Sequence, residues 1–134
     1  MITAVDSSVL IDVLEGDPVH GAGSAEALRR CLREGAVVAC DAVWAEVATA
    51  YGDRIEEVAA GLAEVGIGFS GMSREAALRA AVCWQAYRRK SRVRTRIAAD
   101  FLIGGHALEQ ADRLLTRDQG FFRAYFRPLK VVTP

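Results

Sequence analysis

The sequence predicts an α/β domain in which helices cover both faces of a mostly parallel sheet. Short apolar runs that end at an aspartate alternate with segments in which apolar residues recur at helical spacing, and strands separated by helices form parallel sheets. The chain has 134 residues, of which 51% are hydrophobic and 25% charged. A chain of this size can bury one core without disulfides or a structural metal, so we predict a single domain over residues 1–134.

Two apolar runs are predicted to be buried strands. They are Ile2–Val5, which is followed by Asp6, and Ala36–Cys40, which is followed by Asp41. Short continuous apolar stretches of this kind are typical of strands that are covered on both faces. Weaker strand candidates are residues 66–69, 114–116 and 130–132.

Apolar residues recur at the spacing of a helix face in several segments between these strands. Ser24 is the expected N-cap of the second helix and Gly35 its stop, and the fourth helix follows Ser73. The helical segments are residues 9–14, 25–32, 55–62 and 77–87.

Acidic and basic residues balance over the whole chain but not along it. Residues 1–67 contain twelve acidic and four basic residues, whereas residues 68–134 contain five acidic and thirteen basic residues. Six of the bases lie in residues 88–96, and fifteen of the seventeen are arginine, whose planar guanidinium suits phosphate oxygens. The pattern fits a polyanionic partner, and it fits equally a solvated, arginine-rich helix end.

Cysteine content and hydropathy indicate the compartment. Cys31, Cys40 and Cys83 form no Cys-x-x-Cys pair, so we expect buried free thiols rather than disulfides or a zinc site. No apolar run approaches the roughly 20 residues that span a bilayer, and the first residues do not resemble a signal peptide. We therefore expect a cytoplasmic protein without membrane attachment.

Two aspartates are placed where strands end. Asp6 follows the first strand, and Asp118 follows the fourth through Arg117. In a parallel sheet ligands bind beyond the carboxyl ends of the strands, so both carboxylates are expected at that edge, although Asp6 could instead only cap the helix that follows it. Asp112 precedes the fourth strand and is expected at the opposite edge, in a structural role.

Two further carboxylates interrupt apolar helical segments. Glu46 lies in residues 42–51 and Asp100 in residues 97–108. A carboxylate is rarely found on an apolar helix unless it is paired, hydrogen-bonded or bound to a cation. Glu46 could also lie at an exposed edge of its helix.

Four carboxylates at one edge of a sheet would repel one another unless a cation compensates their charge. An all-oxygen set of ligands, without cysteine or a suitable histidine, favours Mg²⁺ or Mn²⁺ over zinc. Such ions promote phosphodiester cleavage by activating water and neutralising charge on phosphate oxygens. The sequence therefore predicts a metal-dependent nuclease.

Three rival functions fit the residues less well. A phosphatase of the haloacid dehalogenase type also has an aspartate after its first strand, but it needs a second aspartate where this chain has Ser8. Ser/His/Asp hydrolysis would depend on His20 or His106, and His106 lies about 120° from Asp100 around an ideal helix, so a core role is expected for it. A non-catalytic RNA-binding module could use the arginines alone, but it would not need the carboxylates.

The order and spacing of four segments, spread over nearly the whole chain, carry a resemblance to a known family. They are Val5-Asp6-Ser7-Ser8-Val9-Leu10, the helix around Glu46, residues 96–107 and residues 114–123. Together they resemble the PIN domains and, among these, the VapC-like toxins of type II toxin–antitoxin pairs. The resemblance implies a three-layer α/β/α domain with a central, mostly parallel sheet.

The resemblance also implies an endoribonuclease whose acidic pocket binds Mg²⁺ or Mn²⁺. Asp6 and Asp100 match its main metal ligands, Asp118 matches a further ligand, and Glu46 matches either a ligand or the group that orients the attacking water.

Other positions are matched around these acids. Ser8 and Thr116 correspond to hydroxyl groups that hold the carboxylates in place. Gln119 and Gly120 stand where some members have a further acid, so a second metal ion is not implied here.

The resemblance further implies partners: an RNA substrate, a cognate VapB-like antitoxin whose C-terminal segment wraps the toxin, and a second copy in a homodimer. A PIN nuclease that processes RNA without acting as a toxin is the alternative. We expect four arginines at the mouth of the pocket to hold the RNA backbone without reading its sequence. They are Arg92, Arg94, Arg96 and Arg117.

Overall fold

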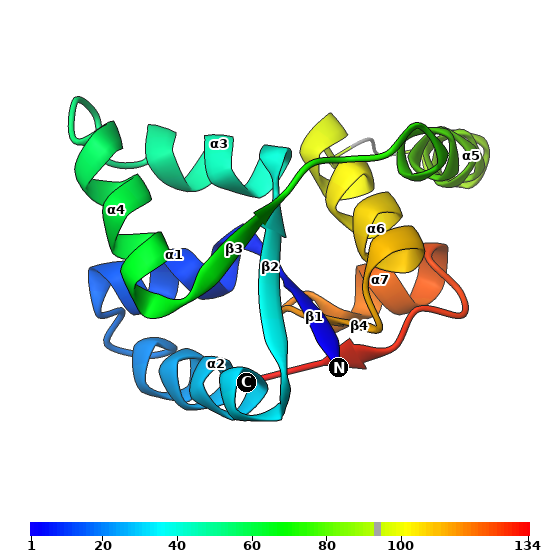
Figure 1. Ribbon diagram of the computed structural model, residues 1–134. Coiled ribbons are helices and arrows are strands. Elements are labelled where there is room, and N and C mark those ends of the chain that lie inside the picture. Colours follow the sequence, from blue (N-terminus) through cyan, green and yellow to red (C-terminus); the bar gives the residue numbers. More distant parts are fainter. Residues whose placement is uncertain (93–94) are drawn as a thin grey trace.

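Strands and helices alternate along the chain of the computed structural model, which describes residues 1–92 and 95–134. Within these residues five strands form one parallel sheet in the order β3-β2-β1-β4-β5 (Figure 1). The strands are β1 (Ile2–Val5), β2 (Ala36–Cys40), β3 (Ile67–Ser70), β4 (Arg113–Leu115) and β5 (Val131–Val132). The predicted α/β class with a parallel sheet is confirmed.

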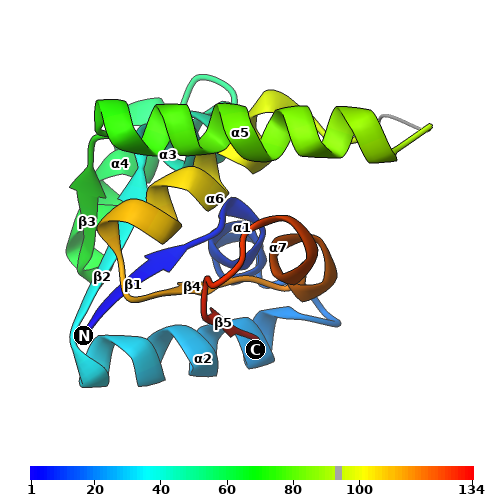
Figure 2. The ribbon, with the colours of Figure 1, turned by 90° about the vertical axis from the view of Figure 1, so that its right-hand side faces the viewer.

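Helices cover both faces of the sheet and give three layers. Helices α1, α2 and α4 lie on one side and α5, α6 and α7 on the other (Figure 1), and the turned view places α2 and α5 on opposite sides of the strands (Figure 2). Helix α5 packs on α6. The helices are α1 (Ser7–Glu15), α2 (Gly21–Glu34), α3 (Asp41–Thr49), α4 (Ile55–Val65), α5 (Arg74–Lys90), α6 (Ala98–Gln110) and α7 (Gln119–Tyr125).

The first two strands have the predicted bounds, and the weaker candidates form β3, β4 and β5 with shifted ends. Ser73 caps α5, since its side chain accepts a hydrogen bond of 3.1 Å from the Ala76 amide. Ser24 was predicted as an N-cap, and this is wrong because α2 begins at Gly21. The buried Ser24 hydroxyl instead donates to Asp12.

The opposite edge of the sheet contains Asp112, as predicted. Its carboxylate accepts a 2.6 Å hydrogen bond from the amide of Ile2, and its own amide donates to the Ile2 carbonyl. Asp112 therefore holds the start of β1. All three cysteines are free and buried, and within the described ranges no helix is long and apolar enough to cross a membrane.

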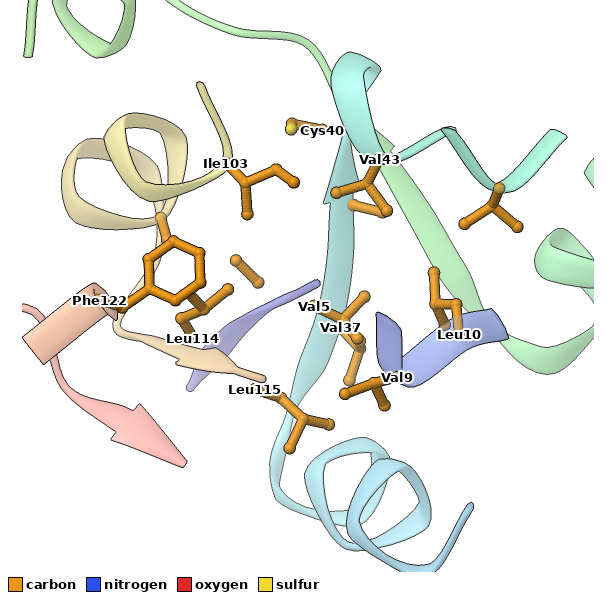
Figure 3. Packing of buried hydrophobic residues seen from close by; sticks show 14 of the residues in the cluster. Val5, Val9, Leu10, Val37, Cys40, Val43, Ile103, Leu114, Leu115 and Phe122 are labelled. Atoms are coloured by element: carbon orange, nitrogen blue, oxygen red, sulfur yellow. The ribbon is translucent and has the colours of Figure 1, made fainter. Parts of the chain in front are cut away.

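The hydrophobic core lies on both faces of the sheet. In Figure 3, Ile103 and Phe122 pack from one side of the strands, whereas Val9 and Leu10 pack from the other. Burial on both faces explains why β1 and β2 are mostly apolar rather than alternating between apolar and polar residues.

Helices α5 and α6 approach each other closely at Gly105. A methyl group there would lie 2.5 Å from the carbonyl oxygen of Ala76 and 3.0 Å from Cβ of Ala80. We expect Gly105→Ala to lower the free energy of unfolding by about 1–3 kcal/mol, because the helices must move apart.

The matched control is Gly61→Ala in α4, where a methyl group meets nothing within 4 Å. This change is expected to raise the free energy of unfolding by about 0.5–1 kcal/mol. Urea unfolding of both variants measures the difference. Equal stabilities would contradict the close approach of α5 and α6.

His106 lies in the core, on α6, with Nε2 2.9 Å from the Ser70 hydroxyl. Burial lowers the pKa of His106 below its ordinary value, because a low-dielectric surrounding disfavours the imidazolium. The unfolded chain takes up this proton below about pH 6.5, while the folded protein does so only at lower pH. We therefore expect His106 to make the protein less stable as the pH falls below about 6.5, with a slope of at most about 1.4 kcal/mol per pH unit.

Unfolding in urea between about pH 7.5 and 5.5 checks this expectation. The variant His106→Gln should lose this part of the pH dependence. If wild type and variant keep parallel profiles, the folded protein binds the proton as readily as the unfolded chain.

Candidate active site

Asp6 is placed at the carboxyl edge of the sheet by β1. Its amide donates to the Leu115 carbonyl at 2.9 Å and so continues the pairing of β1 with β4. Asp6 occupies the residue before α1, but its side chain makes no capping hydrogen bond. The interpretation of Asp6 as only a helix cap is therefore wrong.

Hydroxyl groups hold the Asp6 carboxylate instead. Oδ2 accepts a hydrogen bond of 2.7 Å from Thr116 Oγ1 and one of 3.4 Å from Ser8 Oγ. Asp6 is only 8% exposed. The Thr116 hydroxyl in turn accepts a hydrogen bond of 3.0 Å from the amide of Asp118. One buried hydroxyl thus links two of the predicted acidic residues.

Glu46 reaches the same edge from α3. Its Oε1 accepts a 3.0 Å hydrogen bond from Ser7 Oγ, which lies 3.4 Å from Oδ1 of Asp6. No role was predicted for Ser7 from the sequence. Its position directly after the strand-end aspartate is the signal that could have found it.

Asp100 lies in the first turn of α6, where its carboxylate accepts the Ile97 amide at 3.3 Å. Asp100, Asp6 and Asp118 line one cleft of about 420 Å³. Glu46 lines a separate depression and is connected to the cleft through its hydrogen bond with Ser7. The other residues of the cleft wall are Ser7, Ser8 and Arg117.

Burial, with a smaller contribution from neighbouring acids, raises the pKa of three of these carboxyl groups. Burial raises the pKa of Asp6, and the nearby Asp100 adds to the increase. Burial likewise raises the pKa of Glu46, with Asp6 and Asp100 contributing. For Asp100 burial is again the main cause of a raised pKa, and Asp118 contributes. The cleft therefore favours a positive charge beside its acids.

Two of the predicted RNA-binding arginines are paired with carboxylates. Arg96 forms an ion pair with Asp118, and its guanidinium stacks 4.2 Å from the centre of the Phe121 ring. Arg117 forms an ion pair with Asp12.

Of the other two predicted arginines, Arg92 is exposed in the loop after α5, whereas Arg94 lies outside the described residues. The RNA-binding role of all four arginines stays a prediction.

The donor chemistry of the cleft fits a hard divalent cation, because Asp6, Asp100 and Asp118 offer carboxylate oxygens as ligands. A bound cation would also favour the charged forms of Asp6 and Asp100, whose pKa values are raised. In residues 1–92 and 95–134, however, no group of three His, Cys, Asp or Glu side chains is close enough to hold a metal ion. Asp118 is turned to Arg96. The cleft therefore contains suitable ligands, but in this arrangement they do not lie close enough together to form a complete metal site.

Comparison with known proteins agrees with this architecture. A model of the PIN domain matches residues 3–127. The chain belongs to the PIN domain family. The predicted resemblance and the three-layer fold are thereby confirmed.

Solved structures share the fold of this PIN domain at low sequence identity. VapBC2 from Rickettsia felis, bound to a promoter DNA fragment, is 17% identical with a TM-score of 0.76, over 99% of this chain and 98% of that chain. VapBC-1 from nontypeable Haemophilus influenzae is 15% identical with a TM-score of 0.76, again over 99% and 98%. VapC20 from Mycobacterium tuberculosis, a sarcin–ricin loop cleaving toxin, is 15% identical with a TM-score of 0.65, over 96% and 98%. The comparison with curated proteins gives no match.

Proposed function

We propose that this PIN domain is a Mg²⁺- or Mn²⁺-dependent endoribonuclease that acts as the toxin of a type II toxin–antitoxin pair. The observation that supports the proposal is the cleft in which Asp6, Asp100 and Asp118 lie together at the carboxyl edge of the sheet. A bound divalent cation would neutralise these acids and the charge that develops on a phosphate during cleavage.

The residues of the cleft would have different roles. Asp6 and Asp100 would be the main ligands of the cation, and Asp118 would join them once it leaves Arg96. Thr116 and Ser8 fix the Asp6 carboxylate through their hydroxyl groups, as hydrogen-bonding neighbours of metal ligands do.

Glu46 would orient the attacking water and accept its proton. Its raised pKa makes the carboxylate a stronger proton acceptor than an exposed glutamate. The Ser7 hydroxyl, which donates to Oε1, holds Glu46 towards Asp6.

Metal removal tests the nuclease. We expect the purified protein to cleave a panel of structured RNAs with Mg²⁺ or Mn²⁺, to lose that activity in chelator, and to regain it when the metal is restored. Single-stranded DNA of matched sequence serves as the substrate control. Unchanged RNA cleavage in excess chelator would reject the metal mechanism.

The toxin role rests on the proposed nuclease and on the fold that this chain shares with VapBC structures. Induced expression is expected to stop growth, and coexpression of a short protein encoded directly upstream is expected to restore it. The inactive variant Asp6→Asn, expressed at the same level, is the control. Normal growth of cells that contain active nuclease would favour a role in RNA processing instead.

A further inference from the structure

Asp12 is a buried carboxylate outside the proposed metal site. It lies on α1 and is 4% exposed. The hydroxyl of Ser24, on α2, donates to Oδ2 at 2.8 Å. A charged partner reduces the cost of burying a carboxylate, and for Asp12 that partner comes from the far end of the chain.

That partner is Arg117, which binds Asp12 with two hydrogen bonds. Nε donates to Oδ2 at 2.7 Å and Nη2 donates to Oδ1 at 3.1 Å. Paired bonds of this kind fix the plane of a guanidinium as well as its position. Both bonds use one edge of the group, so Nη1 keeps its donors for another ligand.

Arg117 also lines the acidic cleft, and its side chain is 36% exposed. Of the described residues that line the cleft, it is the one with a positive charge. It stands between Thr116, which binds Asp6, and Asp118. A phosphate that enters the cleft would therefore meet a cation whose orientation is already set.

We propose that Asp12 is a positioning residue, which orients the Arg117 guanidinium so that its remaining N–H donors bind a phosphate of the RNA strand. The inference rests on the proposed function and assigns the phosphate contact to Arg117. Preorganisation matters here because a free arginine side chain loses rotamer entropy when it binds, whereas Arg117 is already held by Asp12.

The variant Asp12→Asn separates this role from general electrostatics. It removes a negative charge, so charge alone predicts tighter binding of a polyanion. If Asp12 positions Arg117, the same change weakens RNA binding. Asn keeps the shape and can still accept from Ser24, so the fold should survive.

The test measures single-turnover cleavage of a fluorescent RNA in Mg²⁺, and anisotropy of the same RNA in chelator, which needs no cleavage. We expect Asp12→Asn to raise the half-saturating concentration about 3- to 10-fold and to change the maximal rate less than about twofold. Arg117→Gln should weaken binding at least as much and reduce the slope of log affinity against log salt by about 0.7. The double variant should be no worse than Arg117→Gln, because both changes remove one contact.

Arg123→Gln in α7 is the matched control, since it removes an exposed arginine that is not in the cleft wall. Arg117→Lys, which keeps the charge without the paired bonds, replaces Arg117→Gln if the latter fails to fold. Unchanged or tighter RNA binding by Asp12→Asn overturns the inference, as does a loss of thermal stability without a change in affinity. A wild-type protein that neither binds nor cleaves RNA overturns the proposed function as well.

Discussion

Replacing Asp6 by asparagine should strongly reduce the rate of RNA cleavage and leave the fold at least as stable. Asparagine keeps the shape of the side chain and can accept a hydrogen bond from Thr116, but it lacks the negative charge that would hold a cation. We expect the rate to fall by about 100- to 1,000-fold, as when a charge-stabilising group is removed from an active site. Cleavage at saturating RNA and metal measures the effect.

Stability should change in the opposite direction. The folded protein holds the Asp6 carboxylate with a raised pKa, so above the ordinary pKa the charged form favours unfolding. A neutral side chain removes this cost, and the melting temperature at neutral pH should stay the same or rise. Sites that are built for function often reduce stability in this way.

Asp112→Asn is the control for Asp6→Asn, because it removes one carboxylate at the opposite edge of the sheet. Its activity should stay within about twofold of wild type, as expected for a site far from the chemistry. Two results would contradict the role of Asp6: a variant that cleaves RNA normally, or one that is inactive only because it unfolds.

Replacing Phe101 by alanine should produce the largest loss of stability. Phe101 is fully buried directly after Asp100, and its ring stacks on Trp84 at 5.4 Å. The rings of Tyr87 and Phe121 also lie 5.4 Å from it. Removing the ring leaves a cavity among rigid aromatic neighbours, so we expect a loss of about 3–5 kcal/mol in the free energy of unfolding.

Leu78→Ala provides the comparison for Phe101→Ala. Leu78 lies on α5 and is 51% exposed, so its truncation should change stability by less than about 0.5 kcal/mol. Urea unfolding of both variants gives the two values. A Phe101→Ala protein that is as stable as Leu78→Ala would show that the aromatic cluster is not a rigid part of the core.

Patterns within short segments predicted β1 and β2 well, because both strands are largely buried on two faces and are therefore mostly apolar in sequence. The N-terminus of α2 was mispredicted for a physical reason. Ser24 satisfies the local rule for a cap, but its hydroxyl is used by Asp12 on another helix. A capping rule that considers only neighbours in the sequence cannot take account of Asp12, which lies twelve residues away and competes for the hydroxyl.

In the candidate site, too, local patterns predicted some residues, whereas contacts between distant segments determine others. The sequence indicated that Asp6 and Asp118 share an edge, since both follow strands of one parallel sheet, and the structure places them in one cleft. The sequence did not indicate a role for Ser7 or Asp12. Their roles depend on contacts with Glu46 and Arg117, which are distant in the chain.

Local sequence patterns were enough to predict the alternation of strands and helices. They also predicted the edge of the sheet at which the acids gather, because parallel strands bring their carboxyl ends together. The ion pairs, in contrast, could be assigned only from the folded protein, in which Arg96 binds Asp118 and Arg117 binds Asp12. Hydrophobic periodicity is a local property that each segment carries in its own residues. The choice of ion-pair partner is not local, since it depends on how side chains from remote segments are packed and on how much water is excluded around them.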